Sequence, residues 1–217
     1  MIKNLLPSAL LCLCCIATYA QEARDTETDR KDTRSGQFIK NPSFEDEMHS
    51  IRNRRFGPNG EGELFGGRLP KGYIPGWVII NDEEATSKIE ISTEELLDKT
   101  QQKALRWSIT EATEAAPATI MNASFHGIEV TKGERYTLSF WARADKRYKG
   151  PFCVGLFNRR TGEWCAQATI KGKIKKRWKK YTITFVADKE DEKARFVMTA
   201  GKAGTLYLDE VSLIVED

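Results

Sequence analysis

The sequence predicts an all-β fold, an antiparallel β-sandwich or jelly roll. Two local observations support this prediction. Short segments in which apolar and polar residues alternate recur along the chain, and glycine-containing turns separate them. A third observation is size, because the chain without its predicted signal peptide, about 197 residues, falls within the range of one such domain.

The N-terminal residues predict export. Lys3 supplies a positive charge, an apolar run follows from Leu5 to Ile16, and Thr18-Tyr19-Ala20 offers a small-x-small cleavage site. We therefore expect residues 1–20 to be a signal peptide. The apolar run is shorter than the ~20 residues that span a bilayer, so we expect a secreted protein without a transmembrane segment. The expected location is the periplasm, the cell surface or the medium.

Three cysteines lie inside this predicted signal peptide, at positions 12, 14 and 15, and raise the alternative of a lipid anchor. That processing requires a small residue before the cysteine, whereas Leu11, Leu13 and Cys14 occupy those places. We therefore favour the unanchored form.

Cleavage leaves Cys153 and Cys165, which flank the predicted turn Asn158–Gly162 and so lie on neighbouring strands. A turn centred on Arg159 makes them direct partners, as a disulfide bond requires. A turn centred between Arg160 and Thr161 instead places Cys153 opposite Ala168. A disulfide bond and two buried free thiols both remain open.

The rest of the chain divides into two parts. Residues 21–37 are almost all polar and carry both charge signs, which predicts a disordered linker. Residues 38–217 form the predicted sandwich, with a long glycine- and arginine-rich loop at about 47–73. The net charge of +3 points to no nucleic-acid or membrane partner.

Within the domain, the first predicted element is a short surface helix at Thr93–Lys99, capped by Ser92 or Thr93. The strands are predicted from alternating apolar residues, among which Trp107, Tyr136 and Phe140 are assigned to the core. Predicted turns lie at Thr131–Glu134, Arg160–Gly162 and Gly201–Gly204. The alternating apolar residues are Leu105, Trp107 and Ile109; Tyr136, Leu138, Phe140 and Ala142; Val154 and Leu156; Tyr181, Ile183 and Phe185; Phe196 and Met198; Leu206 and Leu208.

Five motifs occur in a fixed order: Asn41–Glu45, Pro75–Trp77, the block from Gly127 to Arg143, Trp178–Thr182 and Gly204–Leu213. Together they resemble the carbohydrate-binding modules of bacterial glycosidases, which are galactose-binding-like jelly rolls. The likeness is greatest to the N-terminal module of α-L-arabinofuranosidases and covers about residues 38–214. The resemblance implies a galactose-binding-like jelly roll here.

The resemblance also implies a function, namely a secreted carbohydrate-binding module for plant-type or other complex polysaccharides, associated with a glycoside hydrolase. In the arabinofuranosidases the catalytic barrel would begin soon after the equivalent of Leu213, so we expect no catalytic residues and no enzymatic activity in this chain. No catalytic triad, zinc-ligand or phosphate-loop spacing is visible. The alternatives are a structural or protein-interaction sandwich, and a separated N-terminal piece of an arabinofuranosidase-like enzyme.

A sugar site needs an aromatic plane surrounded by polar side chains. One face of the strand that contains Tyr136 offers Ser139, Trp141 and Arg143. The alternative is that Trp141 packs under the long loop or against the other sheet. Other candidate carbohydrate-binding residues, expected near this face, are Trp164, Gln167, Arg106 and His126.

Two further expectations concern ions. The resemblance implies a structural Ca²⁺ bound by Glu45 and Asp209, and the alternative is that these carboxylates pair with lysine or arginine or cap turns. Lys171 to Lys180 contains seven basic residues in ten positions. This run predicts either a solvated, lysine-protected edge strand, which we favour, or a surface for anionic glycans.

Overall fold

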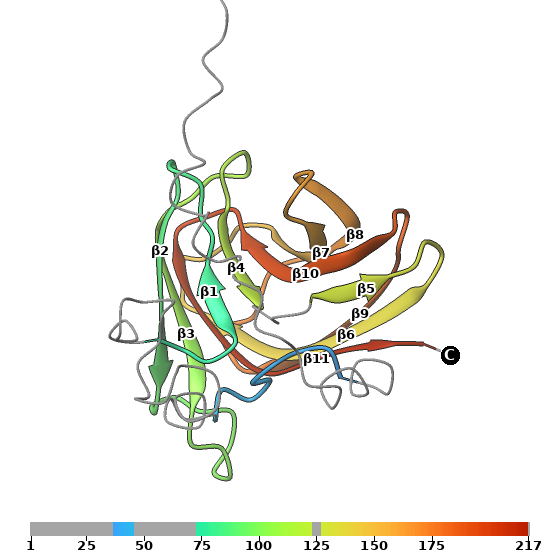
Figure 1. Ribbon diagram of the computed structural model, residues 1–217. Helices are drawn as coiled ribbons and strands as arrows, with labels where there is room; N and C mark the ends of the chain where they lie inside the picture. Colours follow the sequence, from blue (N-terminus) through green and yellow to red (C-terminus); the bar gives the residue numbers. More distant parts are fainter. Residues whose placement is uncertain (1–36, 46–72, 123–126, 217) are drawn as a thin grey trace, which may run out of the picture.

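A computed structural model describes residues 37–45, 73–122 and 127–216. These residues form two antiparallel sheets that pack face to face, as Figure 1 shows, and contain no helix. The all-β sandwich prediction is therefore confirmed. The predicted signal peptide, the linker up to residue 36, the long loop at 46–72 and His126 lie outside the described residues. Nothing in the described part of the chain is a helix long and apolar enough to cross a membrane.

The first sheet, sheet A, has the strand order β1-β4-β10-β7-β8. A sixth strand, β5, also pairs with β10 but lies outside this order. The second, sheet B, has the order β2-β3-β11-β6-β9. Sheet A consists of β1 (Trp77–Ile79), β4 (Ala118–Asn122), β5 (Ile128–Val130), β7 (Phe152–Asn158), β8 (Glu163–Thr169) and β10 (Asp191–Ala200). Sheet B consists of β2 (Thr86–Ser92), β3 (Ala104–Glu111), β6 (Arg135–Ala144), β9 (Lys179–Val186) and β11 (Gly204–Val215).

The core lies between the inner faces of the two sheets. Along β6 every second residue is buried, which is the period-two pattern expected of a strand with one face in the core. Phe140 packs between Phe152 of sheet A, 5.8 Å between ring centroids, and Tyr181 of sheet B, 5.5 Å. The core assignments of Trp107, Tyr136 and Phe140 are confirmed, since none of the three is exposed.

Asn122 joins the segment 37–45 to the end of the sandwich. Its Oδ1 accepts a hydrogen bond from the Lys40 amide at 3.0 Å, and its Nδ2 donates to the Lys40 and Gly76 carbonyls at 2.9 Å each. The next residue, Trp77, donates its indole N–H to the Asn41 carbonyl and is 1% exposed. These contacts explain why the first two sequence motifs occur together, and Trp77 closes this end of the core.

The predicted helix at Thr93–Lys99 is wrong. The segment forms bends instead, and Glu95 has a left-handed φ of 57°, which no helix interior contains. The Glu95 carboxylate pairs with Arg143, and its carbonyl accepts a hydrogen bond from the Trp178 indole at 2.9 Å. Tertiary contacts therefore override a local helical preference.

No disulfide bond joins Cys153 and Cys165, and both are free thiols. The turn lies between Asn158 and Glu163, and a register shift after Leu156 then places Cys153 opposite Thr169 rather than Ala168. Cys153 is half-buried on the outer face, whereas Cys165 belongs to the core. Burial raises the pKa of the Cys165 thiol to about 11.

Candidate functional site

The predicted sugar-binding residues lie on two different sheets. Ser139, Trp141 and Arg143 are on β6 of sheet B, with Arg106 two strands away on β3. Trp164 and Gln167 are on β8, the edge strand of sheet A. The candidate residues are therefore divided between sheet B and the edge of sheet A, and their joint role in binding one sugar stays a prediction.

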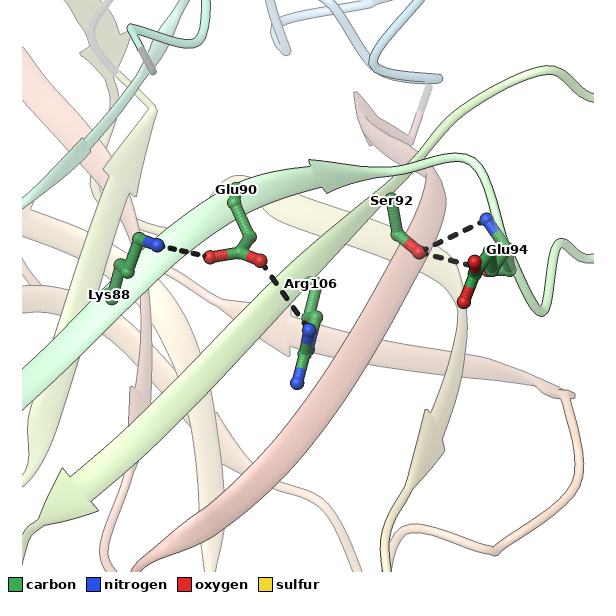
Figure 2. A network of polar contacts seen from close by, with 5 residues as sticks. All are labelled: Lys88, Glu90, Ser92, Glu94 and Arg106. Atoms are coloured by element: carbon green, nitrogen blue, oxygen red, sulfur yellow. Dashed lines mark hydrogen bonds and ion pairs between the residues drawn. The ribbon is translucent and has the colours of Figure 1, made fainter. Parts of the chain in front are cut away.

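On the outer face of sheet B the arginines already have partners. The Arg143 guanidinium lies 4.4 Å from the centroid of the Tyr207 ring and pairs with Glu95, and its side chain is only 19% exposed. Figure 2 shows the Glu90 carboxylate of β2 between Lys88, at 2.6 Å, and Arg106, at 3.4 Å. The hydrogen bond from Lys88 lowers the pKa of Glu90. Both arginines of this face thus have a carboxylate partner, although their Nε atoms have no hydrogen-bond partner among the described residues.

Figure 2 also shows a local contact just after β2: the Ser92 hydroxyl donates to the Glu94 carbonyl and accepts the Glu94 amide. The segment after β2 then reaches Arg143 and Trp178 through Glu95. Trp141 itself is half-buried, with Asp209 and Lys180 as its neighbours in the sheet. The outer face of sheet B is therefore partly covered by the chain itself.

Trp164 and Gln167 line an open hollow of about 400 Å³ at the edge of sheet A. We call this the β8 hollow. One side is β8, and the other is the end of β9, at Val186, with the turn that follows it. Its lining residues are Glu163, Trp164, Ala166, Gln167, Val186, Asp188 and Lys189.

The β7–β8 hairpin holds the Trp164 ring in place. Trp164 packs edge-on against Phe157, with 5.3 Å between ring centroids and 70° between planes. A Cβ added at Gly155 would lie 3.0 Å from Trp164 Cζ3 and 2.1 Å from the Ala166 carbonyl oxygen. Only glycine therefore fits under this ring. Its position inside a strand is a sequence signal for close approach that could have identified this site.

An apolar row extends from the β8 hollow across the outer face of sheet A. Gly155 is paired with Gln167 on one side and with Val197 on the other, and Val197 is paired with Met121. Val197 and Met121 are 1% and 4% exposed, yet neither belongs to the core cluster between the sheets. Alternation along β4 and β10 places them on the outer face, but no motif distinguishes them in the sequence.

Charged groups form the rim of the β8 hollow. The Lys189 ammonium lies 2.7 Å from Glu163 Oε1 and lowers the pKa of that carboxyl by hydrogen bonding. The amides of Asp188 and Lys189 donate to the Cys165 carbonyl at 2.9 and 3.3 Å, which fixes this turn against β8. The hollow thus combines an aromatic ring, an amide and a charged rim, which are the groups that hold a sugar.

The two predicted calcium ligands lie in a separate, acidic place. Asp209 is completely buried; its Oδ1 accepts the Glu210 amide at 2.8 Å, and its Oδ2 has no hydrogen-bond partner among the described residues. Burial raises the pKa of Asp209 to about 7, and the charges of Glu210, Glu45 and Asp98 add to the effect. A buried carboxylate oxygen without a partner, among other carboxylates, suits a hard cation.

Glu45 is held in place by backbone groups. Its Oε1 accepts the amides of Gln102 and Lys103 at 2.9 Å each, and its carbonyl accepts the Lys103 ammonium at 3.0 Å. The Glu45 carboxylate thus caps two backbone amides, as the alternative of a turn cap expects, and Lys103 bonds to the Glu45 backbone carbonyl. No group of three or more metal-ligating side chains is found in the described ranges, so backbone carbonyls would have to complete a Ca²⁺ site.

Fold and site together define a β-sandwich binding module of the carbohydrate-binding class. The sequence profile of the family described as carbohydrate binding domain (CBM_4_9) matches residues 36–205. The chain belongs to this family and is a carbohydrate-binding module. A comparison with curated protein sequences finds no match.

Solved structures show the same fold. An arabinose-bound α-L-arabinofuranosidase is similar at a TM-score of 0.60 and 17% identity, over 85% of this chain and 27% of the enzyme. A CBM4 structure is similar at a TM-score of 0.51 and 18% identity, over 82% of this chain and 99% of the other. The chain thus spans about a quarter of the arabinofuranosidase, and the predicted resemblance to a carbohydrate-binding module is confirmed.

Proposed function

We propose that the protein binds a complex polysaccharide, such as a plant-type glycan, at the β8 hollow. The observation that carries this proposal is the Trp164 ring, fixed over Gly155 and open to the hollow that Gln167 also lines. A pyranose or furanose ring would stack its C–H face on the indole. Its hydroxyls would then bond to the Gln167 amide and to the Glu163–Lys189 pair at the rim.

We propose further that the module binds without cutting. The β8 hollow contains two carboxylates, Glu163 and Asp188, so catalysis has to be considered. A glycosidase acid needs a raised pKa to carry a proton at neutral pH, whereas Lys189 lowers the pKa of Glu163. Association with a glycoside hydrolase, in the same complex or as a companion protein, is part of this proposal.

Two other parts of the proposal come from the sequence. Residues 1–20 direct export without a lipid anchor, which N-terminal sequencing of the mature protein would test by finding Gln21 first. A structural Ca²⁺ is bound by Asp209 and Glu45. The support for it is the partnerless Asp209 Oδ2, and the ion would neutralise the surrounding carboxylates.

The test is calorimetric titration of the purified protein with arabinan, xylan, pectic fragments and host glycans. Trp164→Ala should weaken binding about tenfold or more, since it removes the stacking plane. Trp141→Ala is the matched control, because Trp141 is also a half-buried outward tryptophan but lies on sheet B. Wild-type-like binding by Trp164→Ala, or a larger loss in Trp141→Ala, would show that the β8 hollow is not the site.

A further inference from the structure

The connection between β8 and β9 carries a dense positive charge. Residues 171–180 contain seven lysines and arginines and no carboxylate, although the whole chain has a net charge of only +3. The rest of the chain is therefore net negative. All seven cationic residues are exposed: Lys171, Lys173, Lys175, Lys176, Arg177, Lys179 and Lys180.

These charges have no counter-charge within the described residues. None of the seven forms an ion pair there, and the only aromatic contact is that of the Lys179 ammonium, 5.6 Å from the centroid of the Tyr181 ring. The arginines of sheet B, by contrast, are paired with Glu90 and Glu95. Like charges this close repel one another, and a bound polyanion would relieve that repulsion.

The loop that carries the charges is fixed to the sandwich. Ile174 is 5% exposed and belongs to the core cluster. The Lys175 carbonyl accepts the Ala144 amide at 2.8 Å, and the Lys175 amide donates to the Tyr181 hydroxyl at 2.9 Å. Trp178 is held by its indole N–H on the Glu95 carbonyl. Because the backbone is already ordered, a ligand would not have to order it on binding.

Lys175, Lys176, Arg177, Trp178 and Lys179 line a shallow hollow of their own. We call it the Trp178 hollow; it shares no lining residue with the β8 hollow. It offers one half-buried aromatic ring surrounded by four cationic residues and no carboxylate. An acidic sugar suits this set, because its ring stacks on the indole while its carboxylate or sulfate pairs with lysine or arginine.

We propose that the Trp178 hollow and the flanking lysines are a second binding surface, specific for anionic polysaccharides that carry uronate or sulfate groups. A membrane surface is a poorer match, since the only apolar side chains of the run are the buried Ile174 and the half-buried Trp178, which leaves no apolar anchor. Single-stranded nucleic acid usually requires several stacking aromatics, and this run has one.

The test compares two triple variants of the full protein by affinity electrophoresis in polygalacturonate, heparin and neutral xylan at low and physiological salt. The first variant, Lys175→Gln/Lys176→Gln/Arg177→Gln, should bind both anionic polymers about tenfold more weakly, with a shallower salt dependence. The control removes three exposed lysines elsewhere and should stay within about twofold of wild type. Its substitutions are Lys132→Gln, Lys193→Gln and Lys202→Gln.

Stronger retention by polygalacturonate identifies uronate as the recognised group, and stronger retention by heparin identifies sulfate. The proposal fails if wild type is retained by neither polymer, or if the two triple variants lose equal affinity. It also fails if single-stranded DNA or phosphatidylserine vesicles bind as tightly as the glycans and lose as much in the first variant. Loss of xylan binding in Trp164→Ala reports on the β8 hollow alone, so the two proposals fail separately.

Discussion

The replacement Asp209→Asn should remove a large pH dependence from the stability of the metal-free protein. The pKa of Asp209 is about 7 in the folded protein against an ordinary value of 3.8. The folded state therefore holds the proton more tightly than the unfolded state. The contribution of Asp209 to the free energy of unfolding is therefore largest below pH 4, falls as the pH rises through 7 and then levels off. The shift of about three pH units corresponds to roughly 4 kcal/mol, a large part of a typical domain stability of ~5–15 kcal/mol.

The assay is urea unfolding between pH 5 and pH 8 with a chelator present. Wild type should lose roughly 3 kcal/mol over this range, while Asp209→Asn loses only what the other groups contribute. Asp82→Asn, at an exposed carboxylate, is the control for the change in net charge. Added Ca²⁺ at pH 8 should restabilise wild type and not Asp209→Asn. Parallel pH profiles for wild type and Asp209→Asn in chelator would refute the reasoning.

Three further outcomes are expected. Gly155→Ala should lower the free energy of unfolding by ~1–3 kcal/mol and weaken glycan binding, because the new Cβ would lie 2.1 Å from the Ala166 carbonyl oxygen. The control is Gly162→Ala, which has a φ of 75° but nothing within 4 Å of its Cβ; it should lose only ~1 kcal/mol and keep its binding. Thermal melting and calorimetry measure the two effects. A maleimide should label Cys153 in the folded protein and modify Cys165 only after unfolding, because Cys165 is buried and its pKa is about 11. Peptide mass spectrometry measures the labelling, and equal labelling of both cysteines would contradict the register of the β7–β8 hairpin. Asn122→Ala should destabilise the fold by ~2–4 kcal/mol in urea titrations, because two part-buried hydrogen bonds to Lys40 and one to Gly76 are lost. A change under ~1 kcal/mol would contradict this role.

The architecture was predictable because alternation reports directly on which residues of a strand enter the core. Trp107, Tyr136 and Phe140 follow from this pattern alone, and the five ordered motifs supply the family. Alternation does not state which sheet a strand joins. The alternation predicts that Trp141 and Trp164 both face outward. Trp141, however, is on β6, between β11 and β9 of sheet B, whereas Trp164 is on β8, next to β7 at the edge of sheet A. The division of the predicted site residues between two sheets could therefore not be foreseen.

One local prediction failed, and another question stayed open, for a similar reason. The register of the β7–β8 hairpin depends on an irregularity after Leu156 that no turn residue signals, so the relation of Cys153 to Cys165 was open. At Glu95 a helical composition is outweighed by contacts with Arg143 and Trp178, residues about fifty and eighty positions further along the chain. Long-range contacts of this kind have no local sequence pattern.

The position of β11 in the sheet order has a consequence for how the protein folds. This strand, Gly204–Val215, lies between β3 and β6, and its Leu213 amide bonds to the Gln37 side chain 176 residues earlier. Until β11 is synthesised, sheet B exists only as two separate pairs, β2–β3 and β6–β9, so the core cannot close on the ribosome before the strand emerges. The high share of distant contacts among the described residues predicts slow folding.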